Sequence, residues 1–262
     1  MTHYLQEIVR QRHILYAKVY SDLKNSVSST VLKYFWWILE PLLLVAIYTL
    51  LIHNILNRGG PDYPSFVFCG LIVWLWFSRA VTQGSSVLVA MKNVLNQTKL
   101  SLYPLLAAPI IINFIYFIIG LIILMLFRHQ PTLYYLELIP LFILQFLLCL
   151  GLISFLAVIE SHFRDTKNIL SFVMRAWMYL SPVIYSAQHV LNSPHLTETT
   201  KIIYSYNPMT ILLVNYQNIL LYHRGVDWQQ LGILFLISLL LLEAGVLLIR
   251  KFENHIVKAL VV

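Results

Sequence analysis

The sequence predicts an all-α membrane protein, and three observations lead to this fold class. Of the 262 residues, 59% are hydrophobic and only 11% are charged, whereas soluble domains carry about 25% charged residues. The mean hydropathy is +0.75. Several apolar runs approach the length of about 20 residues that an α-helix needs to cross a bilayer. We therefore expect lipid to surround most of the chain.

Six apolar stretches predict six transmembrane helices. The third opens with Pro104 and Pro109, and the fifth is short and contains Arg175 and Pro182. Because no internal repeat interrupts the pattern, we expect a single domain over residues 1–262, with a cytoplasmic segment 1–32, a core 33–250 and a cytoplasmic tail 251–262. The six stretches cover approximately residues 33–56, 64–90, 103–127, 133–159, 168–186 and 230–250.

Two regions outside these stretches are also predicted to be helical. Residues 4–20 repeat apolar side chains at helical spacing with polar residues opposite, which is typical of a helix lying in the membrane interface. Residues 187–229 hold two apolar pieces, around Ile202–Tyr206 and Ile211–Tyr222, that are too short to span a bilayer. We expect short re-entrant helices there, between the last two spans.

Lysine and arginine residues predict the orientation, because basic residues gather on the cytoplasmic loops of membrane proteins. With the N-terminus inside, twelve basic residues lie in cytoplasmic segments and four outside. We therefore expect a multi-pass protein of the bacterial inner membrane with both termini in the cytoplasm. The inside set is Arg10, Arg12, Lys18, Lys24, Lys33, Lys92, Lys99, Arg164, Lys167, Arg250, Lys251 and Lys258, and the outside set is Arg58, Arg128, Lys201 and Arg224.

The sequence lacks the common motifs of catalysis and nucleotide binding. A Walker A loop ends in Gly-Lys-Ser/Thr, whereas Gly59-Gly60 is followed by Pro61. We also find no His-Glu-x-x-His helix, Gly-x-Ser-x-Gly elbow or cluster of metal ligands. Cys69 and Cys149 lie in apolar runs, as small buried side chains do. We expect no catalytic residue, metal or cofactor in this chain, and no nucleic-acid partner.

Charged and aromatic residues inside the apolar stretches are the candidates for a transport path. A basic residue deep in a bilayer costs several kcal/mol unless it pairs, snorkels or faces a wet cavity. Arg79 is deep, whereas Arg175 is roughly 10 Å from the start of its stretch at 1.5 Å per residue. Glu40 is expected either to pair with a basic group or to serve transport. Glu160 lies near the end of its stretch, and we expect its side chain to reach water. The predicted lining set is Arg79, Tyr34, Trp74, Trp76, Tyr116, Arg175, Trp177 and Tyr179, whose aromatic members either stack on sugar rings or simply pack.

Several short motifs follow one another along the chain. They are Ser21-Asp-Leu-Lys-Asn25, the stretch Tyr34–Leu42, Asn96-Gln-Thr-Lys-Leu-Ser-Leu-Tyr-Pro104, Phe163-Arg-Asp-Thr-Lys-Asn168, Ser181-Pro-Val-Ile-Tyr185 and Tyr206-Asn-Pro208. In their joint order and spacing they resemble the permeases of type-2 ABC transporters, specifically the polysaccharide export branch that handles O antigen, capsule and teichoic acid. The resemblance covers most of the chain.

This resemblance implies a permease that forms a homodimer above two copies of a separate ABC ATPase, in which ATP and Mg²⁺ bind. It implies a lipid-linked polysaccharide as the substrate, as in lipopolysaccharide or capsule export, taken from the cytoplasmic leaflet of the membrane lipid. It also implies that cytoplasmic helices pass the motion of the ATPase to the channel. The matching positions for this coupling are Arg10, Arg12, Lys92, Asn96, Lys99, Arg164 and Asp165.

Three alternatives remain open on sequence grounds. The same fold can export a drug or a small lipid, and neighbouring genes for sugar transferases would separate these cargoes. A membrane-embedded glycosyl or phosphoryl transferase needs paired acidic residues in a cytoplasmic loop, where the sequence offers little beyond Glu160 and Asp165. A secondary transporter is expected to show internal repeats, and we find none.

Overall fold

A computed structural model describes residues 2–27, 33–97, 100–128, 133–163 and 165–259, and within these ranges the chain is helical and has no strand. The prediction of an all-α protein is therefore confirmed. In chain order the elements are α1 (Thr2–Arg10), α2 (Arg12–Val27), α3 (Lys33–Tyr48), η1 (Thr49–Ile55), α4 (Tyr63–Ala90), α5 (Lys92–Gln97), α6 (Leu102–Arg128), η2 (Leu133–Glu137), α7 (Leu138–His162), α8 (Thr166–Tyr179), α9 (Ala187–Leu191), α10 (Glu198–Ser205), α11 (Pro208–Leu220) and α12 (Trp228–Ala259).

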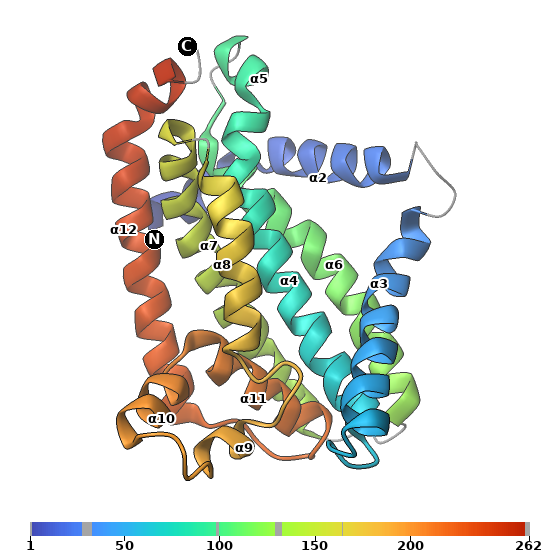
Figure 1. Cartoon of the computed structure of the whole chain (residues 1–262). Helices are drawn as coiled ribbons and strands as arrows, with labels where there is room; N and C mark the ends of the chain where they lie inside the picture. The colour runs from blue at the N-terminus through green and yellow to red at the C-terminus, as the bar shows by residue number, and fades with distance from the viewer. Residues whose placement is uncertain (1, 28–32, 98–99, 129–132, 164, 260–262) are drawn as a thin grey trace.

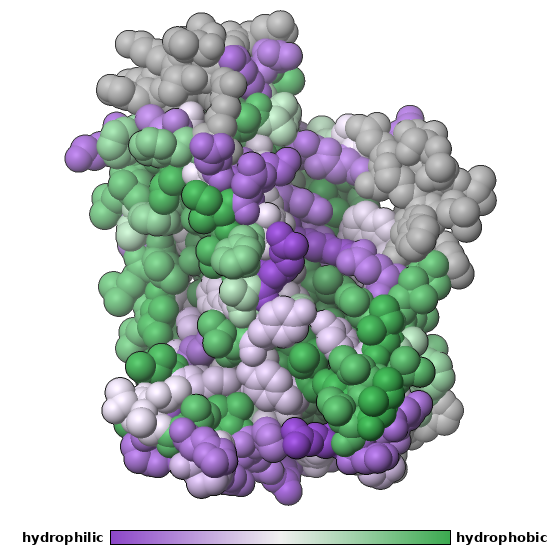
Figure 2. All heavy atoms as spheres, viewed as in Figure 1, coloured by the Kyte–Doolittle hydropathy of each residue, from purple (hydrophilic) through white to green (hydrophobic). Residues whose placement is uncertain are grey.

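Five helices of the described part are long and apolar enough to cross a membrane. They run side by side between two ends of the molecule (Figure 1). Polar side chains gather at both ends, and apolar side chains cover the two flanks between them (Figure 2). We call the end that holds α2, α5 and the end of α12 the α5 end, and the opposite one the α10 end. These features indicate a multi-pass membrane protein. The candidate spans are Trp37–Ile55, Tyr63–Ala90, Leu102–Phe127, Leu133–His162 and Trp228–Phe252, which match five of the six predicted stretches.

The fifth predicted stretch, residues 168–186, is not one continuous helix. α8 has 14 residues and ends at Tyr179, which is short of the about 20 residues needed to cross a bilayer. The chain then turns through residues 180–185. Pro182 has no N–H to continue a helix, and it steers Ser181 away from the helical region. Helix length alone therefore does not confirm the count of six spans.

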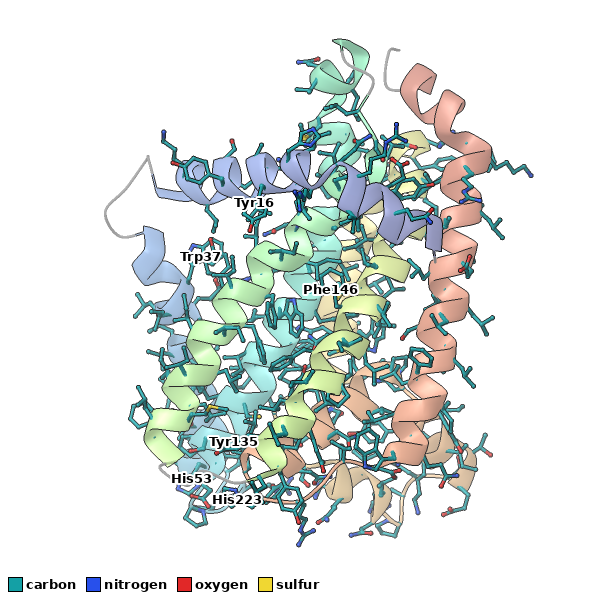
Figure 3. The ribbon with its side chains drawn as sticks, turned by 180° about the vertical axis from the view of Figure 1, so that it is seen from behind. Tyr16, Trp37, His53, Tyr135, Phe146 and His223 are labelled. Atoms are coloured by element: carbon teal, nitrogen blue, oxygen red, sulfur yellow. The ribbon has the colours of Figure 1, made fainter. Side chains whose placement is uncertain are left out.

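The predicted N-terminal helix consists of two helices, α1 and α2, which meet at Gln11. They run across the α5 end rather than along the spans, as Figure 3 shows from behind, and they pack on α6. The Oε1 atom of Gln11 accepts a hydrogen bond of 3.2 Å from the backbone N–H of Ser101. The N-terminal helices are thereby tied to the start of α6.

Both apolar pieces in residues 187–229 are helical, but their surroundings differ. α11 has ten of its 13 residues buried, and it packs against α4, α7 and α12 at the α10 end. By contrast, α10 has no buried residue. α11 therefore belongs to the core, whereas α10 lies on its surface.

α4 and α7 form the centre of the bundle. α4 has 18 of its 28 residues buried, and it contacts α6, α7, α8 and α11. α7 and α12 approach closely because small residues meet at their crossing: a Cβ atom added to Gly245 would lie 2.6 Å from the Cβ of Ser154. Cys69 and Cys149 are both buried and outside any disulfide, as the sequence predicts.

Glu160 does not reach water, so the expectation for this residue is wrong. It is only 3% exposed, and its Oε2 accepts a hydrogen bond of 2.8 Å from Oγ of Ser85 on α4. Burial of a carboxylate is costly without such a partner. Because Ser85 lies 75 positions earlier in the chain, no local pattern around Glu160 signals the contact, which joins α4 and α7 near the α5 end.

Candidate functional site

Arg79 forms an ion pair between two neighbouring spans. Its Nη2 atom, on α4, donates to Oε2 of Glu40 on α3. The side chain of Arg79 is 23% exposed and that of Glu40 is 49% exposed. The Cζ atom of Arg79 also lies 5.8 Å from the centre of the Trp37 ring, within the range of cation–π attraction. Of the two roles that the sequence allowed for Glu40, the structure supports pairing.

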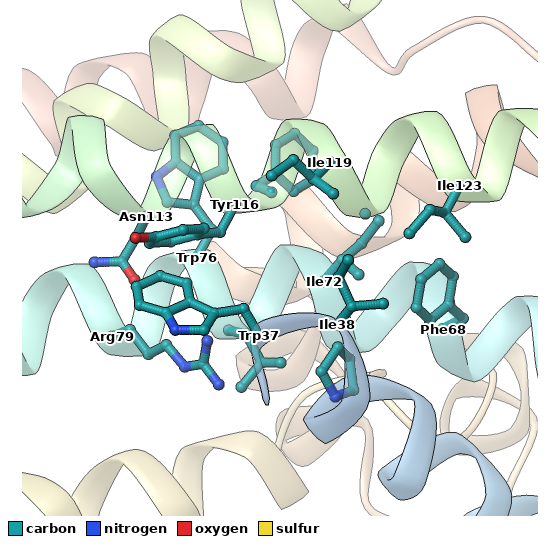
Figure 4. A pocket seen from close by; sticks show the side chains of 14 residues that line it. Trp37, Ile38, Phe68, Ile72, Trp76, Arg79, Asn113, Tyr116, Ile119 and Ile123 are labelled. Atoms are coloured by element: carbon teal, nitrogen blue, oxygen red, sulfur yellow. The ribbon is translucent and has the colours of Figure 1, made fainter. Parts of the chain in front are cut away.

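A small cavity of about 110 Å³ lies beside Arg79, between α3, α4 and α6. Figure 4 shows Trp37 between the side chains of Arg79 and Tyr116, and the rings of Trp37 and Tyr116 are in contact. Three members of the predicted lining set, Arg79, Trp76 and Tyr116, therefore meet here. Sites for small molecules usually measure about 300–1,000 Å³, so this cavity is too small to be a path for a polymer.

Trp74 and Trp76 are buried within the single chain. Nε1 of Trp76 donates a hydrogen bond of 3.2 Å to the carbonyl of Ile110, and its ring lies 5.0 Å from that of Phe117. Trp74 instead packs on Trp177, with 6.4 Å between the ring centres. These three tryptophans hold α4 against α6 and α8. Their role in lining a path stays a prediction.

A polar cluster joins α8 to α11 at the α10 end. Oδ1 of Asn207 accepts from Nε1 of Trp177 at 2.9 Å and from the backbone N–H of Met209 at 3.1 Å, which caps α11. Nδ2 of Asn207 donates to the Leu180 carbonyl and to Oγ of Ser181, each at 3.2 Å. We call Trp177, Leu180, Ser181, Asn207 and Met209 the Asn207 cluster. The Asn207 cluster therefore places two of the sequence motifs, Ser181–Tyr185 and Tyr206–Pro208, in direct contact.

α8 leaves a broad face exposed. Arg175 and Tyr179 both lie on the exposed surface of the helix, and Nε of Arg175 donates to the Ser171 carbonyl at 3.3 Å. Figure 2 shows polar and weakly polar side chains down the middle of this side of the molecule, between apolar flanks. We call the surface between α8 and α3, with Arg175, Tyr179 and Glu40, the α8–α3 face. The side chain of Tyr34 lies outside the described part.

Several residues of the predicted coupling set lie at the α5 end. Arg10 is exposed and lies 3.5 Å from the carboxylate of Glu7. Arg12 is also exposed, and Lys92 begins the short helix α5 and is half-buried. Asp165 precedes α8 and is exposed, without a side-chain capping bond. Lys99, Arg164 and the side chain of Asn96 lie outside the described residues.

The comparisons with known proteins complete this picture. No family model matches the chain. The chain is 28% identical over 250 residues to the O-antigen export system permease protein RfbA of Myxococcus xanthus, covering 94% of both chains. It is 24% identical to a protein of the same name from Klebsiella pneumoniae, over 91% of this chain and 92% of the relative. A second Klebsiella pneumoniae protein of that name is 22% identical over 244 residues.

The chain is a relative of the O-antigen export permeases. The predicted resemblance to the polysaccharide-export permeases is therefore confirmed. In the described part of the chain, no group of three or more His, Cys, Asp or Glu residues is placed to hold a metal ion.

Sequence reasoning missed several residues that hold the helices together. Gln11, Ser85 and Asn207 each join segments that are far apart in the chain. Trp37 is absent from the predicted lining set, although it lies between Arg79 and Tyr116. The one available signal was the Asn-Pro pair at position 207, because asparagine before proline is typical of a helix start.

Proposed function

We propose that the chain is the permease subunit of an ATP-driven exporter that moves lipid-linked polysaccharide of the O-antigen class across the bacterial inner membrane. The observation that carries this proposal is the similarity to O-antigen export permeases over 94% of the chain. The five long apolar helices support the multi-pass membrane location that this role requires.

In this proposal the chain crosses the membrane six times, and α8 with the turn after it makes the fifth crossing. α7 ends at the α5 end, whereas α9 lies at the α10 end (Figure 1). The 14 residues of α8 extend about 21 Å at 1.5 Å per residue, and residues 180–185 add the remaining distance. An even number of crossings also agrees with α2 and the end of α12 lying at the same end of the molecule.

The α5 end is cytoplasmic in this proposal. Lys92, Lys167 and Lys251 lie toward it, in keeping with the excess of basic residues expected on the inner side. α1 and α2 then lie in the inner interface, since they run across the spans. α9, α10 and α11 form the outer, partly re-entrant region.

A second copy of the chain covers the α8–α3 face in the working exporter. In a lone chain, Arg175 and the half-exposed Glu40 would face lipid, which is costly for charged groups. A partner copy would instead enclose a wet path between the two faces. Two ATPase subunits, which bind ATP and Mg²⁺, dock at the α5 end.

The contacts of the α5 end suggest how work reaches this path. Motion of an ATPase passes through rigid contacts between elements. The bond from Ser101 to Gln11 joins the N-terminal helices to α6, and the bond from Ser85 to Glu160 joins α4 to α7. A push on the N-terminal helices or on α5 would therefore reach α6 and α4, the helix that carries Arg79.

Co-purification with a candidate ABC ATPase from the same organism tests this function. The complex should hydrolyse ATP faster when lipid-linked polysaccharide is added, and phosphatidylglycerol should leave the rate unchanged. Stimulation by the small lipid alone would favour a lipid exporter instead. Glycosyl or phosphoryl transfer by the chain without an ATPase would favour the membrane-embedded enzyme.

A further inference from the structure

A second and larger cavity opens at the α10 end, away from Arg79. Its volume is about 540 Å³, which falls within the range of about 300–1,000 Å³ typical of small-molecule sites. It lies between the loop that follows η1, the first turns of α4 and the segment that follows α8. We call it the Tyr63 cleft.

The walls of the Tyr63 cleft are fixed by specific contacts. The hydroxyl of Tyr63 donates a hydrogen bond of 2.9 Å to the carbonyl of Ile184, which joins α4 to the segment after α8. The hydroxyl of Tyr185 donates to the Tyr179 carbonyl at 2.9 Å. Gly59 has a φ of +96°, and its Cα lies against the Tyr63 ring, where a Cβ would clash. The loop above the cleft therefore requires glycine for both its backbone and its packing.

The chemistry of the lining favours a carbohydrate. Tyr185 and the half-exposed Tyr222 give accessible aromatic surface, and the buried rings of Tyr63 and Phe66 back the wall of the cleft. The C–H faces of sugar rings lie well on such accessible rings. Tyrosine also combines an apolar ring with a polar tip. The cleft therefore offers stacking surface and hydrogen-bonding groups together.

The charges around the cleft argue against a phosphate ligand. Arg58 and His189 can donate hydrogen bonds, but Asp62 lines the same cavity. A carboxylate repels an anionic phosphate, whereas it accepts hydrogen bonds from sugar hydroxyls. Both signs of charge together suit a ligand with many hydroxyl groups and little charge.

We propose that the Tyr63 cleft is a carbohydrate-binding site that holds sugar units of the polymer at the outer side of the membrane. The proposal rests on the proposed function for the nature of the polymer and for the orientation of the chain. A sugar unit bound there between cycles of ATP hydrolysis opposes the return of the polymer toward the cytoplasm.

Binding of lipid-free sugars to the intact complex tests this proposal. The permease and its ATPase are placed in nanodiscs, and short oligosaccharides from the exported polysaccharide are titrated while binding is followed by calorimetry. Wild-type complex should bind them, and Tyr222→Ala should weaken binding about tenfold through loss of the ring. Tyr222→Phe should retain most of the affinity. Tyr134→Ala is the control, because this exposed tyrosine lies outside the cleft.

A second variant keeps the test valid if Tyr222→Ala misfolds. Arg58→Ala, in the exposed loop, should also weaken binding while the thermal unfolding of the complex stays unchanged. Wild-type complex that binds dodecyl phosphate but no oligosaccharide would overturn the carbohydrate site. Equal binding by wild type, Tyr222→Ala and Arg58→Ala would overturn it as well. Stimulation of ATP hydrolysis by lipid-linked polysaccharide, measured on the same samples, shows separately whether the proposed function stands.

Discussion

At the scale of single residues, an ion pair and an asparagine each join segments that are distant in the chain. Arg79 and Glu40 neutralise each other between α3 and α4, and each would be costly in lipid without its partner. Asn207 uses both ends of its amide, with Oδ1 accepting two hydrogen bonds and Nδ2 donating two. The first pair lies next to the proposed path, whereas Asn207 fixes the α10 end.

Arg79→Ala should lower export at least about tenfold while the complex with the ATPase still forms. The reason is that Glu40 is half-exposed and, in the dimer, can reach the wet path when its partner is removed, so the fold tolerates the loss better than at a fully buried pair. Export is measured as surface polysaccharide in cells, and assembly by co-purification. Arg224→Ala, at an exposed position, is the control. Full export by a well-expressed Arg79→Ala protein would remove Arg79 from the path.

Asn207→Ala should destabilise the permease by about 1–3 kcal/mol, because it leaves the indole N–H of Trp177 and the Leu180 carbonyl without this partner. The measurement is thermal unfolding of the purified protein in detergent. Asn192→Ala makes the same chemical change at an exposed position and should leave the melting temperature unchanged. Equal melting of the two variants would contradict the role given to the Asn207 cluster.

At the scale of elements, helix contacts follow the distribution of small and polar side chains. α12 packs against α7 at Gly245 and Gly151, where the two helix backbones are too close to accommodate a larger side chain. α3, by contrast, has little of its length buried. It contacts the bundle through Trp37, the ion pair at Glu40 and apolar side chains such as Leu44 and Val45. A loosely packed span beside a polar face is a suitable moving part for a transport path.

Gly245→Ala should destabilise the permease by about 1–3 kcal/mol, since the added methyl group overpacks the crossing of α12 and α7. Gly232→Ala is a matched control on the same helix, because nothing lies within 4 Å of its added Cβ. The control should be neutral or slightly stabilising through its higher helix propensity. Thermal unfolding compares them, and a Gly245→Ala protein as stable as the control would show that the crossing is not close.

Lys92→Glu should weaken the coupling between ATP hydrolysis and transport several-fold, because it reverses the charge at the start of α5, where the ATPase is proposed to dock. The same result is expected for Lys99→Glu, at a position outside the described residues. The ratio of polysaccharide moved to ATP hydrolysed measures coupling. Lys201→Glu, on α10 at the opposite end, is the control. Unchanged coupling in the Lys92 variant would count against docking at α5.

At the scale of the whole molecule, the long apolar spans could be predicted because each is a continuous run of apolar residues. The fifth stretch could not be placed, because Asn207 binds the Leu180 carbonyl and the Ser181 hydroxyl and thereby holds the end of α8 from a distant segment. The candidate site was predicted in part: Arg79, Trp76 and Tyr116 do meet.

The remaining site residues escaped prediction for a physical reason. Most residues of α4 are buried, so the helix has no continuous polar face in its sequence pattern. Without such a face, the sequence does not show which neighbouring helix each residue contacts. Trp76 therefore faces α6 while Trp74 faces α8, although both tryptophans are similar in sequence context. Contacts such as Ser85 with Glu160 join spans that are distant in the chain.

The central claim is that this bundle is a passive path that depends on a separate ATPase for work. The most direct measurement is the movement of lipid-linked polysaccharide across proteoliposome membranes that contain the permease with or without its ATPase and ATP. We predict ATP-dependent movement only when both proteins are present. Movement at the same rate by the permease alone would contradict the account.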